Sequence, residues 1–160
     1  MKTIVAFGCS HTYGVGLKDC YQPRSGPGPV PSQYAWPNIC AHNVNLELKN
    51  YSEPGCSNKA IWHKILIKPV NQQDVVMVLW THPERSCILN DKEQHKRILP
   101  GEKMSGPYYK HYYSDFDSDL DFWLRINHIY TVLNNIGTKQ IHLSFNTPKK
   151  GPVEPWWNHV

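Results

Sequence analysis

The stretch from Thr3 to Gly16 joins a short apolar run to a turn of small residues. Residues Ile4 to Phe7 are continuously apolar, and Gly8 ends the run before a Cys-Ser-His-Thr cluster and two further glycines. A buried strand followed at once by a small-residue turn is how an α/β protein presents a nucleophile or an anion-binding loop. The pattern predicts that Ser10 lies at the carboxyl edge of a sheet, where such folds build their sites.

Three further segments predict strands of the same sheet. Residues Leu46 to Tyr51 alternate between apolar and polar, and Gln140 to Phe145 has the composition of another strand. The segment Asp74 to Trp80 is the most apolar of the chain, which suits a central parallel strand that is covered on both faces. Each of these strands is expected to end in a cluster of small or polar residues or in a loop.

The segments between the strands predict helices. We expect helices over about 36–44, 57–68 and 117–135, the first with Ile39 and Cys40 facing inward and the second with Ile61, Ile65 and Leu66 on one face. Alternation of strands and helices is typical of a doubly wound α/β sheet. We therefore predict one flavodoxin-like three-layer α/β/α domain over residues 1–160, with four parallel strands in the order 2-1-3-4.

Three segments have the composition of loops. Residues 19–37 are rich in proline and glycine, and such a loop either covers a neighbouring site or is an inert surface excursion. Residues 88–117 are polar and are expected to form an insertion with little regular structure. The tail after Phe145 contains three prolines and also predicts a loop.

The composition argues against several classes of protein. The net charge of +4 is mild and the basic residues are scattered, so nucleic-acid binding is not predicted. The apolar runs are far shorter than the roughly 20 residues that span a bilayer. The five cysteines form no CxxC pair, the histidines form no HxH or HExxH motif, and we predict neither a metal nor another cofactor. Without a signal peptide, the expected location is the cytoplasm, with free thiols.

The predicted topology brings three strand ends together. Right-handed crossovers place the carboxyl ends of parallel strands on one edge, which gathers Ser10, Gly55 and the Thr81-His82 pair. A serine there can attack an acyl group if a base deprotonates it and N–H groups stabilise the oxyanion. The alternative is that these residues only make tight turns, and the residues alone leave both possibilities open.

These three strand ends resemble the sequence blocks of a known family. The segments FGCSHTYG, NYSEPGCSNKAIW and DVVMVLWTHPERS resemble, in order and spacing, the first three blocks of the SGNH (GDSL-like) hydrolases. The likeness covers about residues 3–87, and the sequence of these blocks is most similar to that of SGNH-like proteins of tailed bacteriophages. It implies that Ser10 is the nucleophile and that the N–H groups of Ser10 and Gly55, with His82, form the oxyanion hole. It also implies supporting roles for Asn58 and Thr81.

The sequence departs from the family pattern at three blocks, and in the third block His82 stands where the family has an asparagine. Cys9 stands where the first block has an aspartate, and it is expected to face the core, although it could be a thiol nucleophile. No Asp-x-x-His segment, which supplies the base in the family, occurs in the last third of the chain. The histidine of the tail, His159, is then the best candidate base, unless another chain supplies one. His11 is a poor substitute, and His142 is expected to be structural.

Two functions remain open from the sequence. One is an SGNH-like serine esterase that acts on an acyl or acetyl ester, with carbohydrate esters among the candidate substrates. The other is a catalytically degenerate SGNH-like domain that serves as a bacteriophage structural or accessory binding protein, in the host cytoplasm or the virion. Aromatic residues could form its partner surface or pack on the domain's own flank. They are Tyr108, Tyr109, Tyr112, Tyr113, Trp156 and Trp157.

Overall fold

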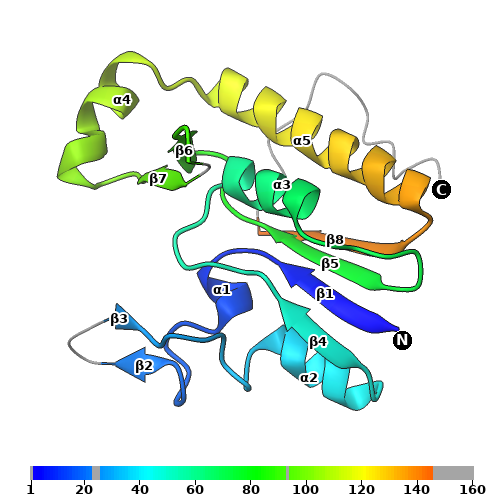
Figure 1. Cartoon of the computed structure of the whole chain (residues 1–160). Coiled ribbons are helices and arrows are strands. Elements are labelled where there is room, and N and C mark those ends of the chain that lie inside the picture. The colour runs from blue at the N-terminus through cyan, green and yellow to red at the C-terminus, as the bar shows by residue number, and fades with distance from the viewer. Residues whose placement is uncertain (1, 23–25, 93, 146–160) are drawn as a thin grey trace.

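A four-stranded parallel sheet forms the centre of the computed structural model (Figure 1), which describes residues 2–22, 26–92 and 94–145. Its strands lie in the order β4-β1-β5-β8, and every neighbouring pair is parallel. This is the predicted order 2-1-3-4 and confirms the predicted fold class. The strands are β1 (Thr3–Phe7), β4 (Glu47–Asn50), β5 (Val75–Trp80) and β8 (Lys139–Ser144).

Helices cover the sheet on two sides (Figure 1). Helices α3 (Asn58–Ile67) and α5 (Asp115–Ile136) pack against each other on one face, and α2 (Trp36–Asn43) packs beneath β4 and β1 on the other. Every residue of β1 is buried, because this strand has a neighbour on each side and helices on both faces. The sequence therefore encodes β1 as a continuous apolar run.

Capping residues fix where two of the helices begin and end. The Ser57 hydroxyl accepts a hydrogen bond from the N–H of Ala60 over 3.2 Å and starts α3. Ser114 caps α5 in the same way, and Gly137 ends α5 in the left-handed conformation with φ 82°. These local signals explain why the boundaries of α3 and α5 lie within two residues of the prediction.

Two residues expected to face inward do not. Ile39 is 50% exposed and Leu66 is 39% exposed. Helix α2 instead buries Pro37 and Ala41, which are four residues apart, and Ile39 lies about 200° around the helix from Pro37. Leu66 lies about 100° from Ile65, which is buried, so it falls at the margin of the buried stripe.

The segment after β5 is more regular than the sequence predicts. Residues 88–117 were expected to have little regular structure, and this expectation is wrong. The polar sequence of this segment does not predict its strands, because the strands are defined by their pairing and lack a periodic pattern of apolar residues. An antiparallel hairpin, β6 (Ser86–Leu89) and β7 (His95–Ile98), is followed by a 3₁₀ turn, η1 (Lys103–Ser105), and by α4 (Gly106–His111).

The proline-rich segment 19–37 is a loop, as predicted, with one short strand pair. Strands β2 (Tyr21–Gln22) and β3 (Gly26–Pro27) are antiparallel. The segment is tied to the first helical turn, because the Tyr13 hydroxyl donates to the Gly28 carbonyl over 2.8 Å and the Ser32 N–H donates to the Tyr13 carbonyl over 2.8 Å. Within the described ranges, no helix is both long and apolar enough to span a bilayer.

Candidate functional site

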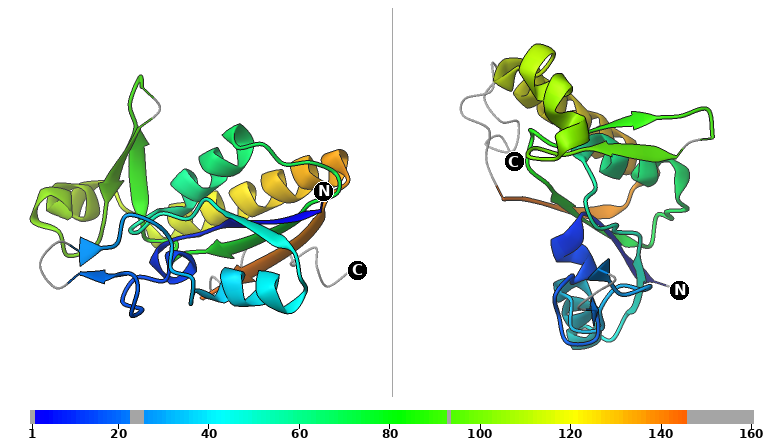
Figure 2. Two further views of the ribbon diagram at one scale, coloured as in Figure 1. Left: turned by 60° about the horizontal axis from the view of Figure 1, so that its bottom comes forward. Right: turned by 90° about the vertical axis from the view of Figure 1, so that its left-hand side faces the viewer.

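The carboxyl ends of β1, β4 and β5 meet at one edge of the sheet, where α1 (Ser10–Tyr13), the β6–β7 hairpin and α4 also lie (Figures 1 and 2). Backbone hydrogen bonds join the first two turns directly. The N–H of Tyr51 donates to the Ala6 carbonyl over 2.8 Å, and the N–H of Glu53 donates to the Gly8 carbonyl over 3.1 Å. The turn after β4 is thereby fixed against the turn that carries Ser10.

Asn58 joins the second turn to the third. Its Oδ1 accepts a hydrogen bond from the Thr81 N–H over 2.8 Å, and its Nδ2 donates to the Thr81 carbonyl over 3.0 Å. Both residues are buried, with Asn58 3% exposed and Thr81 1% exposed. A side-chain amide matches one donor and one acceptor of the backbone, so Asn58 satisfies both polar groups of Thr81 at the end of β5.

Ser10 begins α1 and is partly exposed, while Cys9 before it is fully buried in the core. This burial confirms the expectation that Cys9 faces the core. A glycine is required at position 8, because a Cβ there would lie 2.1 Å from Thr12 Oγ1. The absence of a side chain at Gly8 lets Thr12 of α1 pack closely on the end of β1, and α1 then begins with Ser10 at the sheet edge.

Ser10 Oγ lies 4.0 Å from Cys9 Sγ. Among the described residues, no imidazole nitrogen is within hydrogen-bond distance of this hydroxyl. His11 Nδ1 lies 4.0 Å from Cys9 Sγ, on the same short turn. Its ring also contacts Phe145 at a centroid distance of 4.6 Å.

Gly55 adopts the left-handed conformation, with φ 74°, in the turn after β4. Neither its N–H nor that of Ser10 donates to a backbone carbonyl of a described residue. Arg97 of β7 packs on this glycine, as shown by the distance of 2.6 Å between Arg97 Nη1 and the position that a Cβ on Gly55 would occupy. The second turn therefore carries a cation that the sequence analysis did not foresee.

His82 follows β5 and Thr81 and is partly exposed. Its Nδ1 lies 3.8 Å from Glu84 Oε1, and its ring stacks on Phe145 at a centroid distance of 5.9 Å. Phe145 thus contacts both His82 and His11 at the end of β8. The structure brings the predicted residues Ser10, Gly55 and His82 to the same sheet edge, whereas His159 lies outside the described residues.

His142 lies within β8 and serves the packing of the sheet, as expected. Its Nδ1 accepts a hydrogen bond from Trp80 Nε1 over 3.0 Å, and its ring stacks on that indole. Burial lowers the pKa of His142 to about 4, so the ring is neutral at pH 7 and can accept this bond. The described residues contain no group of three or more histidine, cysteine or acidic side chains that could hold a metal.

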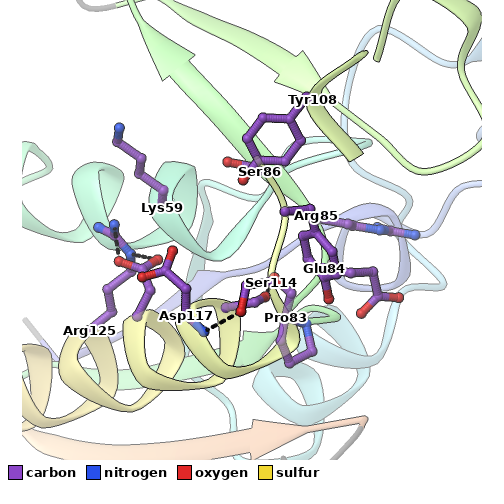
Figure 3. Close-up of a pocket in the computed structure, with 12 residues that line it drawn as sticks. Lys59, Pro83, Glu84, Arg85, Ser86, Tyr108, Ser114, Asp117 and Arg125 are labelled. Atoms are coloured by element: carbon purple, nitrogen blue, oxygen red, sulfur yellow. Dashed lines mark hydrogen bonds and ion pairs between the residues drawn. The ribbon is translucent and has the colours of Figure 1, made fainter. Parts of the chain in front are cut away.

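A pocket of about 180 Å³ opens beside the loop that follows His82 (Figure 3). Its lining comes from the first turn of α3, residues 83–86, α4 and the beginning of α5, and it includes Lys59, Glu84, Tyr108, Asp117 and Arg125. Ser10, Gly55 and His82 do not line it. The pocket is therefore a neighbour of the strand-end site and not the site itself.

The predicted tyrosine cluster has two parts. Tyr109 is half-buried, and its hydroxyl, which has a single proton to donate, lies 2.8 Å from the Glu84 carbonyl and 2.9 Å from the Ile98 carbonyl, so it holds α4 against the strand-end loops. Burial is the main reason that its pKa rises to about 12. Tyr108 and Tyr113 pack against Tyr109, whereas Tyr112 is 78% exposed. Trp156 and Trp157 lie outside the described residues, and a partner surface stays a prediction.

The comparisons with known proteins give a likeness in fold. No protein-family model and no curated protein matches the chain. The structure is similar to a member of the lipolytic G-D-S-L family from Veillonella parvula, with 14% identity, a TM-score of 0.46 and coverage of 89% of this chain. The structure is also similar to a protein assigned to the same family from Desulfitobacterium hafniense, with 14% identity, a TM-score of 0.47 and coverage of 88% of this chain. The chain spans 57% of the length of each.

Sequence reasoning missed Arg97, Glu84 and Phe145 at the site. Glu84 lies two residues after His82, and Phe145 follows β8 directly, so both could have been suspected from their position at a strand end. Arg97 had no such signal. It reaches Gly55 only because the hairpin, which the sequence does not reveal, folds back over the second turn.

Proposed function

We propose that the chain is a serine ester hydrolase of the SGNH type that acts on an acyl or acetyl ester, with carbohydrate esters among the candidate substrates. One observation carries the proposal: the hydrogen bonds from Asn58 to Thr81 and from Glu53 to Gly8 fix the three strand ends as one unit around Ser10. A preorganised set of donors beside a partly exposed serine is what acyl transfer requires. The order of the three sequence blocks supports the same chemistry.

In the proposed mechanism, Ser10 Oγ attacks the ester carbonyl carbon while a base takes the hydroxyl proton. The N–H groups of Ser10 and Gly55, with His82, stabilise the negative oxygen of the tetrahedral intermediate. The intermediate then expels the alcohol, which receives the proton from the base, and leaves an acyl group on Ser10. Water attacks the acyl group, with the same base accepting its proton, and releases the carboxylic acid and the free serine.

We assign the base to His159, with Asn58 and Thr81 as positioning residues. Asn58 acts through the backbone of Thr81, which precedes His82, and so holds the third turn at a fixed distance from the second. A serine that lacks a base loses most of its power in acyl transfer, although donors for the oxyanion leave a residual rate. The proposal therefore requires a histidine that reaches Ser10.

A second candidate function has an observation in its favour. The neighbour of Ser10 Oγ is Cys9 Sγ at 4.0 Å, and no imidazole of the described residues is within hydrogen-bond distance of it. A catalytically degenerate domain is expected to have the serine-bearing turn of the family but no base beside it. That domain would serve as a bacteriophage structural or accessory binding protein, as the sequence resemblance implies.

Labelling with a fluorophosphonate probe separates the two functions. We expect the full chain to be labelled on Ser10, the Ser10→Ala chain to be unlabelled, and the His159→Ala chain to be labelled far more slowly. Circular dichroism shows whether each variant keeps its fold. A well-folded parent chain that takes no label would contradict the esterase proposal and favour the binding function.

A further inference from the structure

Arg97 brings a permanent positive charge to the second strand-end turn. Its Nη1 donates to the Pro54 carbonyl over 3.3 Å. A Cβ on Gly55 would lie 2.6 Å from Nη1 and 3.0 Å from Cδ, so the arginine side chain packs directly on the glycine. A guanidinium has five N–H donors, and the bond to Pro54 uses one of them. The cation thus lies beside the residue proposed to bind the oxyanion.

The pairing of the hairpin sets the direction of Arg97. In the antiparallel register Arg97 pairs with Cys87, which is 3% exposed, and Lys96 pairs with Ile88, which is 56% exposed. Paired residues of neighbouring strands share a face, and successive residues of one strand alternate between faces. Arg97 therefore lies on the face that is turned to the body of the molecule, and Lys96 lies on the outer face.

A second arginine reaches the third turn. Arg85 Nη1 donates to Thr81 Oγ1 over 3.1 Å. In Figure 3 the Arg85 side chain points away from the part of the pocket that Lys59 and Asp117 line. Two of the three strand-end turns are thus each in contact with a guanidinium.

Two acidic side chains of these turns contact groups other than the arginines. Glu53, in the second turn, forms an ion pair with Lys64 of α3. Glu84, in the third turn, lies 3.8 Å from His82 Nδ1. Within the part of the chain that the structure describes, neither of the two arginines has a carboxylate as its hydrogen-bond acceptor, since Arg97 donates to a carbonyl and Arg85 to a hydroxyl. Their charges are therefore not neutralised by these contacts.

We propose that the Ser10 site takes an ester that carries a negatively charged group, and that Arg97 binds this group, with Arg85 adding to the local positive potential. The inference rests on the proposed function, because it places the anion beside an ester held at Ser10. A carboxylate or a phosphate fits the planar guanidinium fork through two parallel hydrogen bonds. Arginine keeps its charge at every working pH, so the preference does not depend on a titration at this residue.

Two esters that differ in one group make the test. Monomethyl succinate and methyl butyrate present the same methyl ester and nearly the same chain, but one ends in a carboxylate and the other in a methyl group. We expect kcat/KM of the full chain to be about tenfold higher for monomethyl succinate, the effect of one charge-assisted hydrogen-bond pair at an exposed arginine. The ratio should fall as salt is added, because salt screens exposed charges.

The variants come from neighbouring positions of one strand. Arg97→Gln should reduce the ratio of the two rates to near one, and Arg97→Lys should leave an intermediate ratio. Lys96→Gln removes the same charge from the outer face of the hairpin and should keep the ratio of the parent chain. Equal ratios in Arg97→Gln and the parent chain would overturn the inference.

A binding measurement separates this inference from the esterase proposal. Ser10→Ala cannot form an acyl group, so the binding of the two esters to it can be measured by NMR titration without turnover. Tighter binding of monomethyl succinate that is lost in Ser10→Ala/Arg97→Gln supports the anion site, even if the fluorophosphonate probe finds no reactive serine. Labelling of Ser10 together with equal binding of both esters would leave the esterase proposal in place and overturn the anion site.

Discussion

The hydrogen bonds of Asn58 make a quantitative prediction about stability. Replacement of Asn58 by alanine removes the acceptor for the Thr81 N–H and the donor to the Thr81 carbonyl, which lie at 2.8 Å and 3.0 Å. Thr81 is 1% exposed, so water cannot readily replace either partner. A buried backbone group without a partner costs about 1–3 kcal/mol. Two such groups predict that the free energy of unfolding falls by about 2–6 kcal/mol, against a total of about 5–15 kcal/mol for a typical domain.

Asn90→Ala is the matched control. Asn90, like Asn58, makes two hydrogen bonds to the backbone, and its Oδ1 accepts both of them, from the N–H groups of Lys92 over 3.0 Å and Gln94 over 2.9 Å. Asn90 is exposed, so water can satisfy the groups that its loss leaves open. We expect this variant to lose less than about 1 kcal/mol.

The assay is urea unfolding at pH 7 and 25 °C, followed by tryptophan fluorescence. The free energy of unfolding is extrapolated for each chain, and the slopes are compared so that a change in the unfolded state is recognised. Equal losses for Asn58→Ala and Asn90→Ala would refute the reasoning, because the burial of the Thr81 groups would then have no energetic weight. Slower fluorophosphonate labelling of Asn58→Ala, at a urea concentration where it is still folded, would connect the same bonds to the site.

Two further predictions concern titration and thiol reactivity. Burial lowers the pKa of His142 to about 4. Between about pH 6.5 and pH 4 this histidine therefore binds a proton in the unfolded chain but not in the folded chain. The free energy of unfolding should fall as the pH is lowered through this window. We expect the free energy of unfolding to fall by about 2 kcal/mol, which is less than the full pKa shift would give because the ring is partly exposed. His142→Asn should reduce the slope of this free energy against pH. An unchanged slope would contradict the assignment. Among the cysteines, Cys40 is partly exposed, whereas Cys9, Cys20, Cys56 and Cys87 are each at most 3% exposed, and burial raises the pKa of Cys56 to about 12. Iodoacetamide at pH 8 should therefore modify Cys40 first in the native chain, as read by peptide mass spectrometry, and rapid modification of Cys56 would show that its burial is wrong.

Some parts of the site could be predicted because they depend on neighbours in the sequence. The run that forms β1, the glycine that follows it and the cap at Ser57 each make local signals, and the strand–helix alternation fixes which strand ends meet. The convergence of Ser10, Gly55 and His82 at one edge follows from this alternation alone. The spacing of the three blocks could therefore suggest both the fold and the position of a site.

Other parts depend on contacts between residues that are far apart in the chain. No local pattern predicts that Asn58 binds Thr81, 23 residues away, or that Phe145 contacts two imidazole rings at the end of β8. The polar segment after β5 gives no apolar period, so its hairpin and the placement of Arg97 over Gly55 follow only from pairing and packing. The error at Ile39 has a related cause, because its apolar character does not say which side of α2 faces the sheet.

The order of the elements and the sheet edge at which a nucleophile could lie were thus predictable from the sequence. These are properties of local periodicity, turn residues and chain direction, which neighbouring residues encode. The groups that surround Ser10 and the charge beside Gly55 follow from the packing of the folded chain. Such contacts depend on how separate elements pack, and packing is fixed by the whole core and not by any one segment.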